Sequence, residues 1–324
     1  MEVIQQLAQP VQREFEQCKT EFDSLMHHSS ALLNEVLDLI AQRKGKMMRP
    51  LLTLLSAKLF GPVTDESVQT ALAFEFFHTA SLIHDDIVDE SNERRGLPSV
   101  NCAYSDSVAV LVGDYMLANA LKVAARTGRV ELIRTISQTA QDLVDGELLQ
   151  LRNVLNQTIS EDAYYHIIHA KTASLFAACA ESGARTTGAS DKQLEAMYSF
   201  GEYVGKAFQI KDDIFDFVAG SEIGKPTGID MAEGKLTLPV IHALFATEDQ
   251  KMFELAYKVK DGSVSADEIK QLVQFSIDNG GIDYAVEVME RYAKYAKQQL
   301  DSAPDSDAKQ SLMKYVDFVL ERNW

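Results

Sequence analysis

The order of apolar and polar residues along this chain is helix-like almost throughout. Alternation of the kind that marks a strand is scarce, and no Asn-Gly turn joins two β-branched runs. Ala, Leu, Glu and Gln, which favour helix over long windows, are abundant. The chain also has no proline between Pro98 and Pro226. The pattern therefore predicts an all-α protein.

Glycine and proline divide this pattern into separate helices, as at Gly61-Pro62 and Gly280-Gly281. The expected helices cover residues 3–26, 29–43, 49–60, 66–91, 101–127, 129–153, 160–186, 190–219, 236–246, 248–259, 264–280, 282–300 and 305–322. Residues 71–90 are apolar nearly all round, which is typical of a helix at the centre of a bundle. No low-complexity linker or shift in composition interrupts the chain, so we expect a single domain over residues 1–324.

Two short acidic stretches are near-copies of each other, 85-DDIVD-89 and 212-DDIFD-216. On a helix, carboxylates at i and i+4 share one face, and like charges at that spacing repel each other. A hard divalent cation with oxygen ligands offsets this repulsion, and Mg²⁺ shares its coordination sphere with substrate phosphates. Solvated acidic turns are the alternative, but two such copies by accident are much less probable than one. We therefore expect two aspartate-bearing helices on either side of a central cavity, with Mg²⁺ and a diphosphate between them.

The overall charge restricts the class of partner. The chain of 324 residues has 31 basic and 48 acidic side chains, so its formal net charge is 31 − 48 = −17. A nucleic-acid surface and a polybasic lipid-docking patch are both disfavoured by this balance. An anionic substrate must instead meet a local group of Lys, Arg or metal.

The remaining composition favours a cytoplasmic protein. Cys18, Cys102 and Cys179 are odd in number and widely spaced, so they predict neither a disulfide framework nor a zinc site. The N-terminal stretch has no apolar core of the kind found in signal peptides. No run approaches eighteen apolar residues, so we expect no transmembrane segment.

The helix that carries the first acidic stretch also predicts a channel. The helix face that carries Asp85 also carries Ser81, His78 and Phe77, which precede it by four, seven and eight residues. The small Ala80 lies beside them. The face is polar at the motif and apolar below it, which suits a ligand with a charged head and a hydrocarbon tail. Tight helix packing is the alternative reason for the small residues.

Basic residues occur where an anion would need them. Lys46 and Arg49 lie beside Gly45, just before a helix that opens at Pro50. The pair Arg94-Arg95 follows the first acidic stretch, and Lys225 and Lys235 flank Asp230 after the second. Arginine suits bidentate phosphate contacts, so these groups are candidates for diphosphate binding.

These motifs resemble those of the trans-isoprenyl diphosphate synthases, the polyprenyl synthetase family, from about Gly45 to Pro239. The matching segments are 45-GKMMRP-50, 85-DDIVD-89, 94-RRG-96, Lys171-Thr172, 208-FQIKDDIFD-216, 224-GKPTGID and 234-GKLTLP-239. The chain departs from the family pattern at Met47, where many members have Arg, and at Asn101, where His is common. The Met47 departure puts one phosphate contact in doubt.

The resemblance implies a role for each matching residue. Asp85, Asp89 and Asp212 would bind the Mg²⁺ that grips an allylic diphosphate, supported by Asp86, Asp213 and Asp216. The leaving diphosphate would be held by Arg94, Lys171, Lys225 and Lys235. Isopentenyl diphosphate would be bound by Gly45, Lys46, Arg49, His78 and Arg95. Thr172 and Gln209 would present oxygen dipoles to the allylic cation, which the isopentenyl double bond attacks.

In this family, bulky residues four or five positions before the first Asp stop chain growth early. Here these positions are Ser81 and Ala80, so the tail should pass until it reaches Phe77 or Phe76. The favoured function is synthesis of a long all-trans polyprenyl diphosphate of the kind used for quinone side chains. The alternative is a geranylgeranyl- or farnesyl-type product. A terpene cyclase and a partner-dependent subunit are less favoured, because the isopentenyl-binding basic set and all six aspartates are retained. The family usually forms homodimers, and residues 101–121 are suitably apolar.

Overall fold

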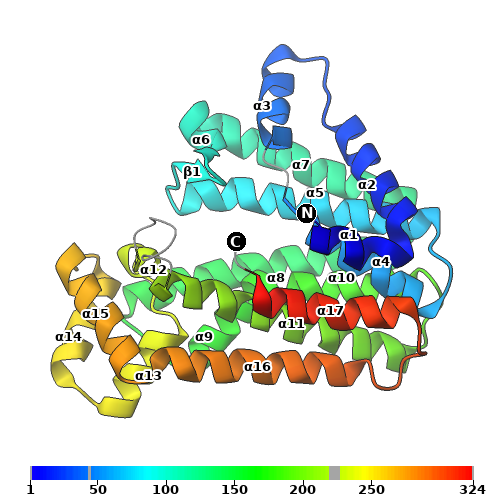
Figure 1. Cartoon of the computed structure of the whole chain (residues 1–324). Helices are drawn as coiled ribbons and strands as arrows, with labels where there is room; N and C mark the ends of the chain where they lie inside the picture. The colour runs from blue at the N-terminus through cyan, green and yellow to red at the C-terminus, as the bar shows by residue number, and fades with distance from the viewer. Residues whose placement is uncertain (1, 43–44, 219–226, 323–324) are drawn as a thin grey trace. The chain divides into compact units, whose positions relative to one another are not determined.

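The computed structural model describes residues 2–42, 45–218 and 227–322, and these residues are almost entirely helical (Figure 1). The longer α-helices are α2 (Gln12–Leu25), α3 (Ala31–Gln42), α4 (Met48–Phe60), α5 (Asp65–Val88), α7 (Asp106–Arg126), α8 (Val130–Leu155), α10 (Ser174–Arg185), α11 (Asp191–Val218), α13 (Leu238–Thr247), α14 (Gln250–Asp261), α15 (Ala266–Asp278), α16 (Gly281–Gln299) and α17 (Asp307–Glu321). The shorter ones are α1 (Glu2–Ala8), α6 (Val100–Ala103), α9 (Glu161–Ile168) and α12 (Ile229–Ala232). The all-α prediction is confirmed.

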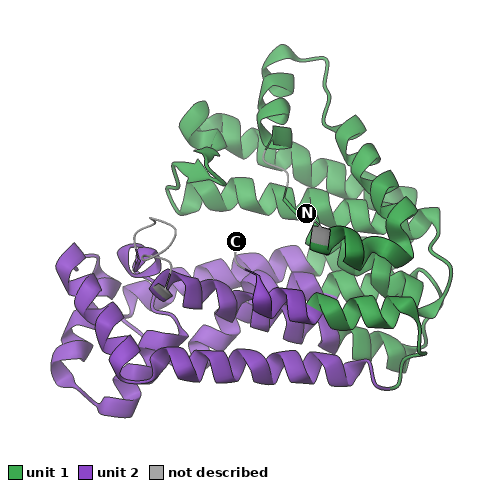
Figure 2. Cartoon of the chain, viewed as in Figure 1, with its two compact units in different colours: residues 1–138, 178–198, 302–315 green, residues 139–177, 199–301, 316–324 purple. Residues whose placement is uncertain are grey.

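Contacts divide the chain into two compact units, each made of several separate segments (Figure 2). Unit 1 comprises residues 1–138, 178–198 and 302–315. Unit 2 comprises residues 139–177, 199–301 and 316–324. The first acidic motif lies in unit 1 and the second in unit 2. The single domain and the cavity between the two motifs stay predictions.

Four features of the backbone differ from the expected helices. The helix expected over residues 101–127 is divided into α6 and α7, because Ser105 caps the start of α7 through its contact with the Val108 amide. The helix expected over residues 3–26 is interrupted by a 3-10 turn at Gln9–Val11, where Pro10 has no N–H to donate. The helix expected over residues 160–186 contains a π-helical turn, His169–Ala173. Two short strands, β1 (Glu93–Arg94) and β2 (Leu97–Pro98), pair as a hairpin after α5. Arg95 and Gly96 both have positive φ, at 55° and 76°, as the tight turn between these strands requires.

Helix α5 is the core of unit 1, as its apolar composition predicts. Its 24 residues extend about 36 Å at 1.5 Å per residue. It packs against α7, α4 and α2, so most of its side chains are buried on every side. The Phe76 ring stacks on Phe22 of α2, with 4.7 Å between the ring centroids. Helix α5 thus carries the first acidic motif on a rigid, well-packed element.

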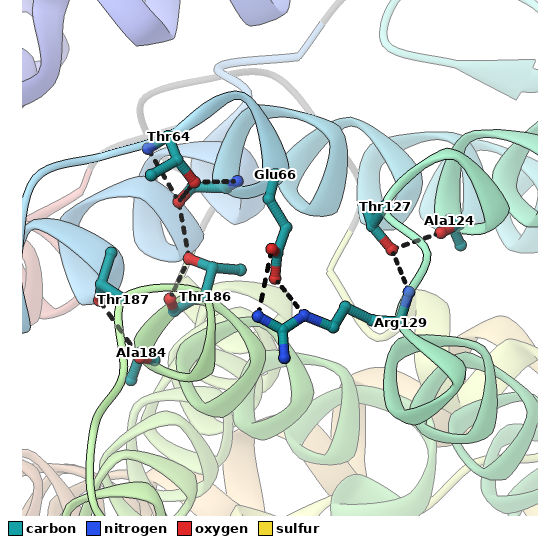
Figure 3. Close-up of polar contacts among 10 residues, drawn as sticks. Thr64, Glu66, Ala124, Thr127, Arg129, Ala184, Thr186 and Thr187 are labelled. Atoms are coloured by element: carbon teal, nitrogen blue, oxygen red, sulfur yellow. Dashed lines mark hydrogen bonds and ion pairs between the residues drawn. The ribbon is translucent and has the colours of Figure 1, made fainter.

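Polar contacts fix the N-terminal end of α5 (Figure 3). Thr64 caps the helix, since its hydroxyl accepts a hydrogen bond from the Ser67 amide. The Ser67 hydroxyl lies 2.6 Å from that of Thr186, which follows α10. Glu66 pairs with Arg129 of the turn before α8 at 3.0 Å. Three segments far apart in sequence are therefore joined here, at the end of α5 opposite to the aspartates.

Candidate active site

The first acidic motif occupies the C-terminal end of α5, and the second occupies that of α11. The C-terminal end of a helix dipole is negative, so it disfavours the charged form of these aspartates in addition to their mutual repulsion. Asp85 and Asp89 are half-buried, and the Asp89 amide donates to the Asp85 carbonyl at 2.8 Å. A bound cation would offset both the dipole and the side-chain charges.

Asp86, the middle carboxylate of the first motif, faces the protein. It is buried, and its Oδ1 accepts from Arg94 Nε at 2.7 Å and lies 2.6 Å from Arg94 Nη2. Arg94 reaches it from strand β1 of the hairpin. Asn101, whose departure from the family pattern carried no predicted consequence, donates to the backbone carbonyls of Asp86 and Ser91 at 3.3 and 3.2 Å. Asn101 thus secures the turn that follows the motif.

A cavity of about 60 Å³ opens beside the first motif in unit 1. By volume it holds roughly four waters, or one compact anionic group of similar size. Its lining residues are Phe22, Ile40, Gly45, Met47, Glu75, His78, Thr79, Leu82, Ile83, Asp86, Arg94, Arg95 and Val100. Four of the residues predicted to bind diphosphate therefore meet in one cavity. The other two candidates in unit 1, Lys46 and Arg49, are absent from the lining, and Lys46 is exposed.

The hairpin turn directs Arg95 onto Gly45. A Cβ atom built on Gly45 would lie only 2.7 Å from Arg95 Nη2, so a larger residue at this position would shift the guanidinium group of Arg95 from its place in the cavity. Met47 follows in a left-handed conformation at the start of α4, with φ of 49°. Its buried side chain contributes an apolar wall to the cavity and offers no positive charge there.

His78 is held as a neutral ring by Arg49, and the two nitrogen atoms Nη1 and Nε2 are 2.9 Å apart. Arginine can only donate, so His78 Nε2 accepts and the ring proton resides on Nδ1. Burial lowers the pKa of His78 well below 6.5, and the positive charges of Arg49 and Arg95 act in the same direction. His78 lies with Leu82 and Asp86 on the cavity wall, whereas the sequence placed it on the face of Asp85.

This environment makes folding stability depend on pH. The folded pKa of His78 lies below the unfolded value, so the unfolded chain takes up a proton first as pH falls below about 6.5. Between pH 7.5 and pH 5.5 the wild type should lose about 1 kcal/mol more stability than His78→Gln. Urea unfolding of both proteins at the two pH values measures the difference. The charged neighbours of His78, which are Glu75, Asp86, Arg49, Arg94 and Arg95, remain in both proteins. Equal losses of stability in the wild type and in His78→Gln would therefore contradict the lowered pKa of His78.

Glu75 is a member of this cavity that the sequence did not single out. Its carboxyl is buried and lines the cavity with His78. Burial raises the pKa of Glu75, and the charges of Arg49 and Arg95 oppose that shift. Glu75 lies three residues before His78 on a helix, and this spacing was the available signal.

In the second motif, Asp212 pairs with a residue from the end of α17. Arg322 Nη2 lies 2.5 Å from Asp212 Oδ1 and donates to the Phe208 carbonyl at 2.9 Å. The guanidinium also lies over the Phe208 ring, 3.6 Å from its centroid. No local pattern in the sequence pointed to Arg322, which is 110 positions away.

Asp213, the middle carboxylate of the second motif, is buried like Asp86. Tyr164 donates to its Oδ2 at 2.6 Å, and Gln209 donates to its Oδ1 at 2.9 Å. Thr172 in turn donates to Gln209 Oε1 at 2.8 Å. Burial raises the pKa of Asp213 to about 7, and the hydrogen bonds from Tyr164 and Gln209 oppose that shift. The chain from Thr172 to Tyr164 joins two predicted site residues, Thr172 and Gln209, to the motif.

Asp216 binds the start of helix α12, which follows the second motif in sequence. Its two oxygens accept from the amides of Ile229 and Asp230, at 2.8 and 3.2 Å, and so cap α12. Burial raises the pKa of Asp230 well above its ordinary value, and the charges of Asp213 and Asp216 add to this. Lys235 donates to Glu233 at 2.7 Å. Lys225, the other lysine predicted in this segment, lies outside the described residues.

Lys171 is held by two side chains of α8. Its Nζ lies 2.5 Å from Glu147 Oε1 and donates to Gln150 Oε1 at 3.2 Å. Sequence reasoning missed both partners. Their spacing of three residues, which puts them on one helix face, was the signal that could have found them.

The residues present fit a hard cation. Acidic groups gather at two negative helix ends, and burial together with neighbouring charge raises the pKa values of Asp213, Asp216 and Asp230. Within the described ranges, no three acidic, His or Cys side chains converge on one point. Mg²⁺ commonly takes one or two carboxylates and completes its sphere with water and substrate phosphates.

The predicted chain-length residues follow α5 downward from the motif. Ala80 and Phe77 are buried, and Ser81 donates to the His78 carbonyl at 2.9 Å. The Phe76 ring stacks on Phe22, and Phe22 lines the cavity of unit 1 described above. The floor of the product channel stays a prediction, and we favour Phe77 over Phe76 because the Phe76 ring already stacks on Phe22.

Comparisons with known proteins agree with these observations. The polyprenyl synthetase family model matches residues 30–275. The chain is 31% identical over 322 residues to an octaprenyl diphosphate synthase from Haemophilus influenzae, covering 99% of this chain and 97% of that one. It is 42% identical to a geranylgeranyl pyrophosphate synthase structure from Bacteroides thetaiotaomicron, with a TM-score of 0.87 and coverage of 99% and 100%. A decaprenyl diphosphate synthase structure from Rhodobacter capsulatus is 33% identical, with a TM-score of 0.92 and coverage of 98% of each chain.

Proposed function

The chain belongs to the polyprenyl synthetase family, and from this premise we propose that it condenses isopentenyl diphosphate with an allylic diphosphate. It is a trans-polyprenyl diphosphate synthase of the medium- to long-chain type. The observation that carries the proposal is the cavity of unit 1, where Gly45, His78 and Arg95 meet beside the first acidic motif. An anion bound there lies next to the carboxylates that would hold the allylic diphosphate.

The carboxylates proposed to hold Mg²⁺ are Asp85, Asp89 and Asp212. The bound cation supplies charge stabilisation for the departing diphosphate. Asp86 and Asp213 have protein partners, so we propose that they orient the motifs through Arg94, Gln209 and Tyr164.

The residues of this chain have three tasks in the reaction. Arg49 and Arg95 bind isopentenyl diphosphate, with neutral His78 fixing Arg49 by their contact. Lys171 binds the departing diphosphate, and to do so the Lys171 ammonium group exchanges its contacts with Glu147 and Gln150 for contacts with the diphosphate. The oxygens of Thr172 and Gln209 would face the allylic cation, which an apolar channel would keep from water. The proton lost after carbon–carbon bond formation passes to the bound diphosphate.

A single incubation tests the proposal. Purified protein is mixed with farnesyl diphosphate, labelled isopentenyl diphosphate and Mg²⁺, and the dephosphorylated products are sized. Label in products longer than geranylgeraniol is expected. Products that stop at that length would instead assign the short-chain activity. Cyclic products without label would assign a terpene cyclase, and no turnover would indicate a subunit that needs a partner.

We further propose that this protein is a homodimer joined through α7. Leu111 is 68% exposed although α7 is strongly apolar, and Val110 and Leu121 are also exposed. Among the described helices, α7 alone has the length and composition to cross a membrane, and 44% of its apolar window is buried in the protein. A partner copy would cover the exposed remainder. Light scattering should give twice the 36.0 kDa chain mass.

A further inference from the structure

Lys171 and Thr172 lie on the π-helical turn His169–Ala173, between α9 and α10. A π-turn carries one residue more than an α-turn, so it is wider and changes the direction in which successive side chains point. Here the two consecutive side chains reach different helices. Lys171 contacts Glu147 and Gln150 of α8, whereas Thr172 donates to Gln209 of α11. The turn therefore presents two neighbouring residues to two walls of the site in unit 2.

The π-turn lies against a glycine on each of these two helices. A Cβ atom on Gly146 of α8 would lie 2.7 Å from Ala170 Cβ and 3.1 Å from Lys171 Cγ. A Cβ atom on Gly205 of α11 would lie 2.5 Å from Ala173 Cα and 3.0 Å from Ala173 Cβ. Cβ atoms essentially never approach other heavy atoms within 3.0 Å. Any larger residue at either position would therefore push the turn away from its helix.

The close approach has a direct consequence for the polar contacts. Gly146 immediately precedes Glu147, so the point where α8 meets the turn lies next to the carboxylate that holds the Lys171 ammonium. Gly205 precedes Gln209 by one helical turn, on the face that meets Ala173. The same two helices thus supply both the close approach and the partners of Lys171 and Thr172. Displacing the turn would move these two residues together.

We propose that Gly146 and Gly205 are positioning residues, which hold the π-turn against α8 and α11 and so place Lys171 and Thr172 for the reaction. The proposal rests on the function given above, in which Lys171 binds the departing diphosphate. It predicts that the glycines act on the allylic half of the reaction. The residues that bind isopentenyl diphosphate belong to unit 1, which contains neither glycine.

The principal test is Gly146→Ala, because its nearest neighbour is a single methyl group. A displacement on the order of 1 Å lowers turnover up to about a hundredfold, so kcat should fall between about tenfold and a hundredfold. The KM for isopentenyl diphosphate should stay within about twofold of the wild type. Ala170→Gly removes the methyl group that the new Cβ would strike, so Gly146→Ala/Ala170→Gly should recover most of the lost activity.

A cycle with Lys171→Met separates positioning from general damage. Because Gly146→Ala acts in part through Lys171, the activity losses of Gly146→Ala and Lys171→Met should combine to less than their sum. Gly201→Ala is the matched control, because Gly201 lies on α11 one turn before Gly205 and approaches Phe176 and Ala177 instead of the π-turn. Its kcat loss should be much smaller than that of Gly205→Ala at equal thermal stability. Additive losses in the cycle, or equal losses for the two α11 variants, would overturn the proposal.

Calorimetry of pyrophosphate binding in the presence of Mg²⁺ gives a readout that does not need turnover. Gly146→Ala should weaken this binding, and the added Ala170→Gly should restore it. Unchanged binding would overturn the positioning role, even if the wild type elongates. Weakened binding in a wild-type protein that fails to elongate would retain the positioning role and refute the proposed function instead. If Gly146→Ala alone does not fold, the double variant and Gly205→Ala supply the same comparisons.

Discussion

Replacing Asp85 by Asn is expected to lower kcat/KM by about a thousandfold. The substitution keeps the shape of the side chain but removes its charge at the negative end of α5, where a cation is needed most. Asparagine is a poor substitute because Mg²⁺ favours carboxylate oxygens. The rate should fall at saturating substrate, and the Mg²⁺ concentration for half-maximal activity should rise. Steady-state kinetics over a Mg²⁺ series measures both quantities.

Two variants make this result specific. Asp267→Asn removes a carboxylate whose side chain is 85% exposed on α15, and its kinetics should match the wild type within twofold. Asp86→Asn weakens the contact with Arg94, which is partly exposed, so its main effect should be a loss of stability of about 1.5–3 kcal/mol. If Asp85→Asn kept activity within tenfold of the wild type at an unchanged Mg²⁺ requirement, Asp85 would not be a metal ligand.

Replacing Ala80 by Tyr should shorten the products while leaving the first condensation intact. Ala80 is buried on α5, five residues before Asp85, and a tyrosine ring there would block the path of the tail. Phe77 lies about 12 Å along the helix from Asp85, so Phe77→Ala should have the opposite effect and lengthen the products. Sizing the dephosphorylated products of each variant measures the shift.

The matched control for the channel is Phe76→Leu. The Phe76 ring stacks on Phe22, so its loss should lower stability and leave product length unchanged. An Ala80→Tyr protein that elongates to the wild-type length would exclude a channel along this face of α5. A change of length in Phe76→Leu without one in Phe77→Ala would move the channel to the other side of the helix.

Much of the fold follows from the sequence, because long windows of good helix formers ended by Gly or Pro leave few alternatives. The π-turn does not, since it packs closely against Gly146 and Gly205 of two other helices, which no local pattern reveals. The hairpin at Glu93–Pro98 was also missed, because its turn uses Arg95 in a left-handed conformation in place of Asn-Gly.

The site could be predicted where its residues are close together in sequence. The aspartates, Lys171-Thr172 and Arg94-Arg95 stand in local motifs, and the structure groups four of the six predicted diphosphate ligands of unit 1 around one cavity. The residues that contact the second acidic motif could not be predicted in this way, because they are far from it in sequence. Tyr164 reaches Asp213 across 49 positions, and Arg322 reaches Asp212 across 110 positions, so only the folded chain reveals either contact.

The position of α17 also has a consequence for biosynthesis. Its buried Tyr315 donates to the Met48 carbonyl in unit 1, next to Arg49, and Arg322 just beyond it pairs with Asp212 in unit 2. On the ribosome, Asp212 is made 110 residues before Arg322, a delay of roughly 5–20 s at about 5–20 residues per second. During that interval the second motif has no guanidinium partner from this helix. Neither unit can reach its final set of contacts before translation of α17, so both complete their folding late in synthesis.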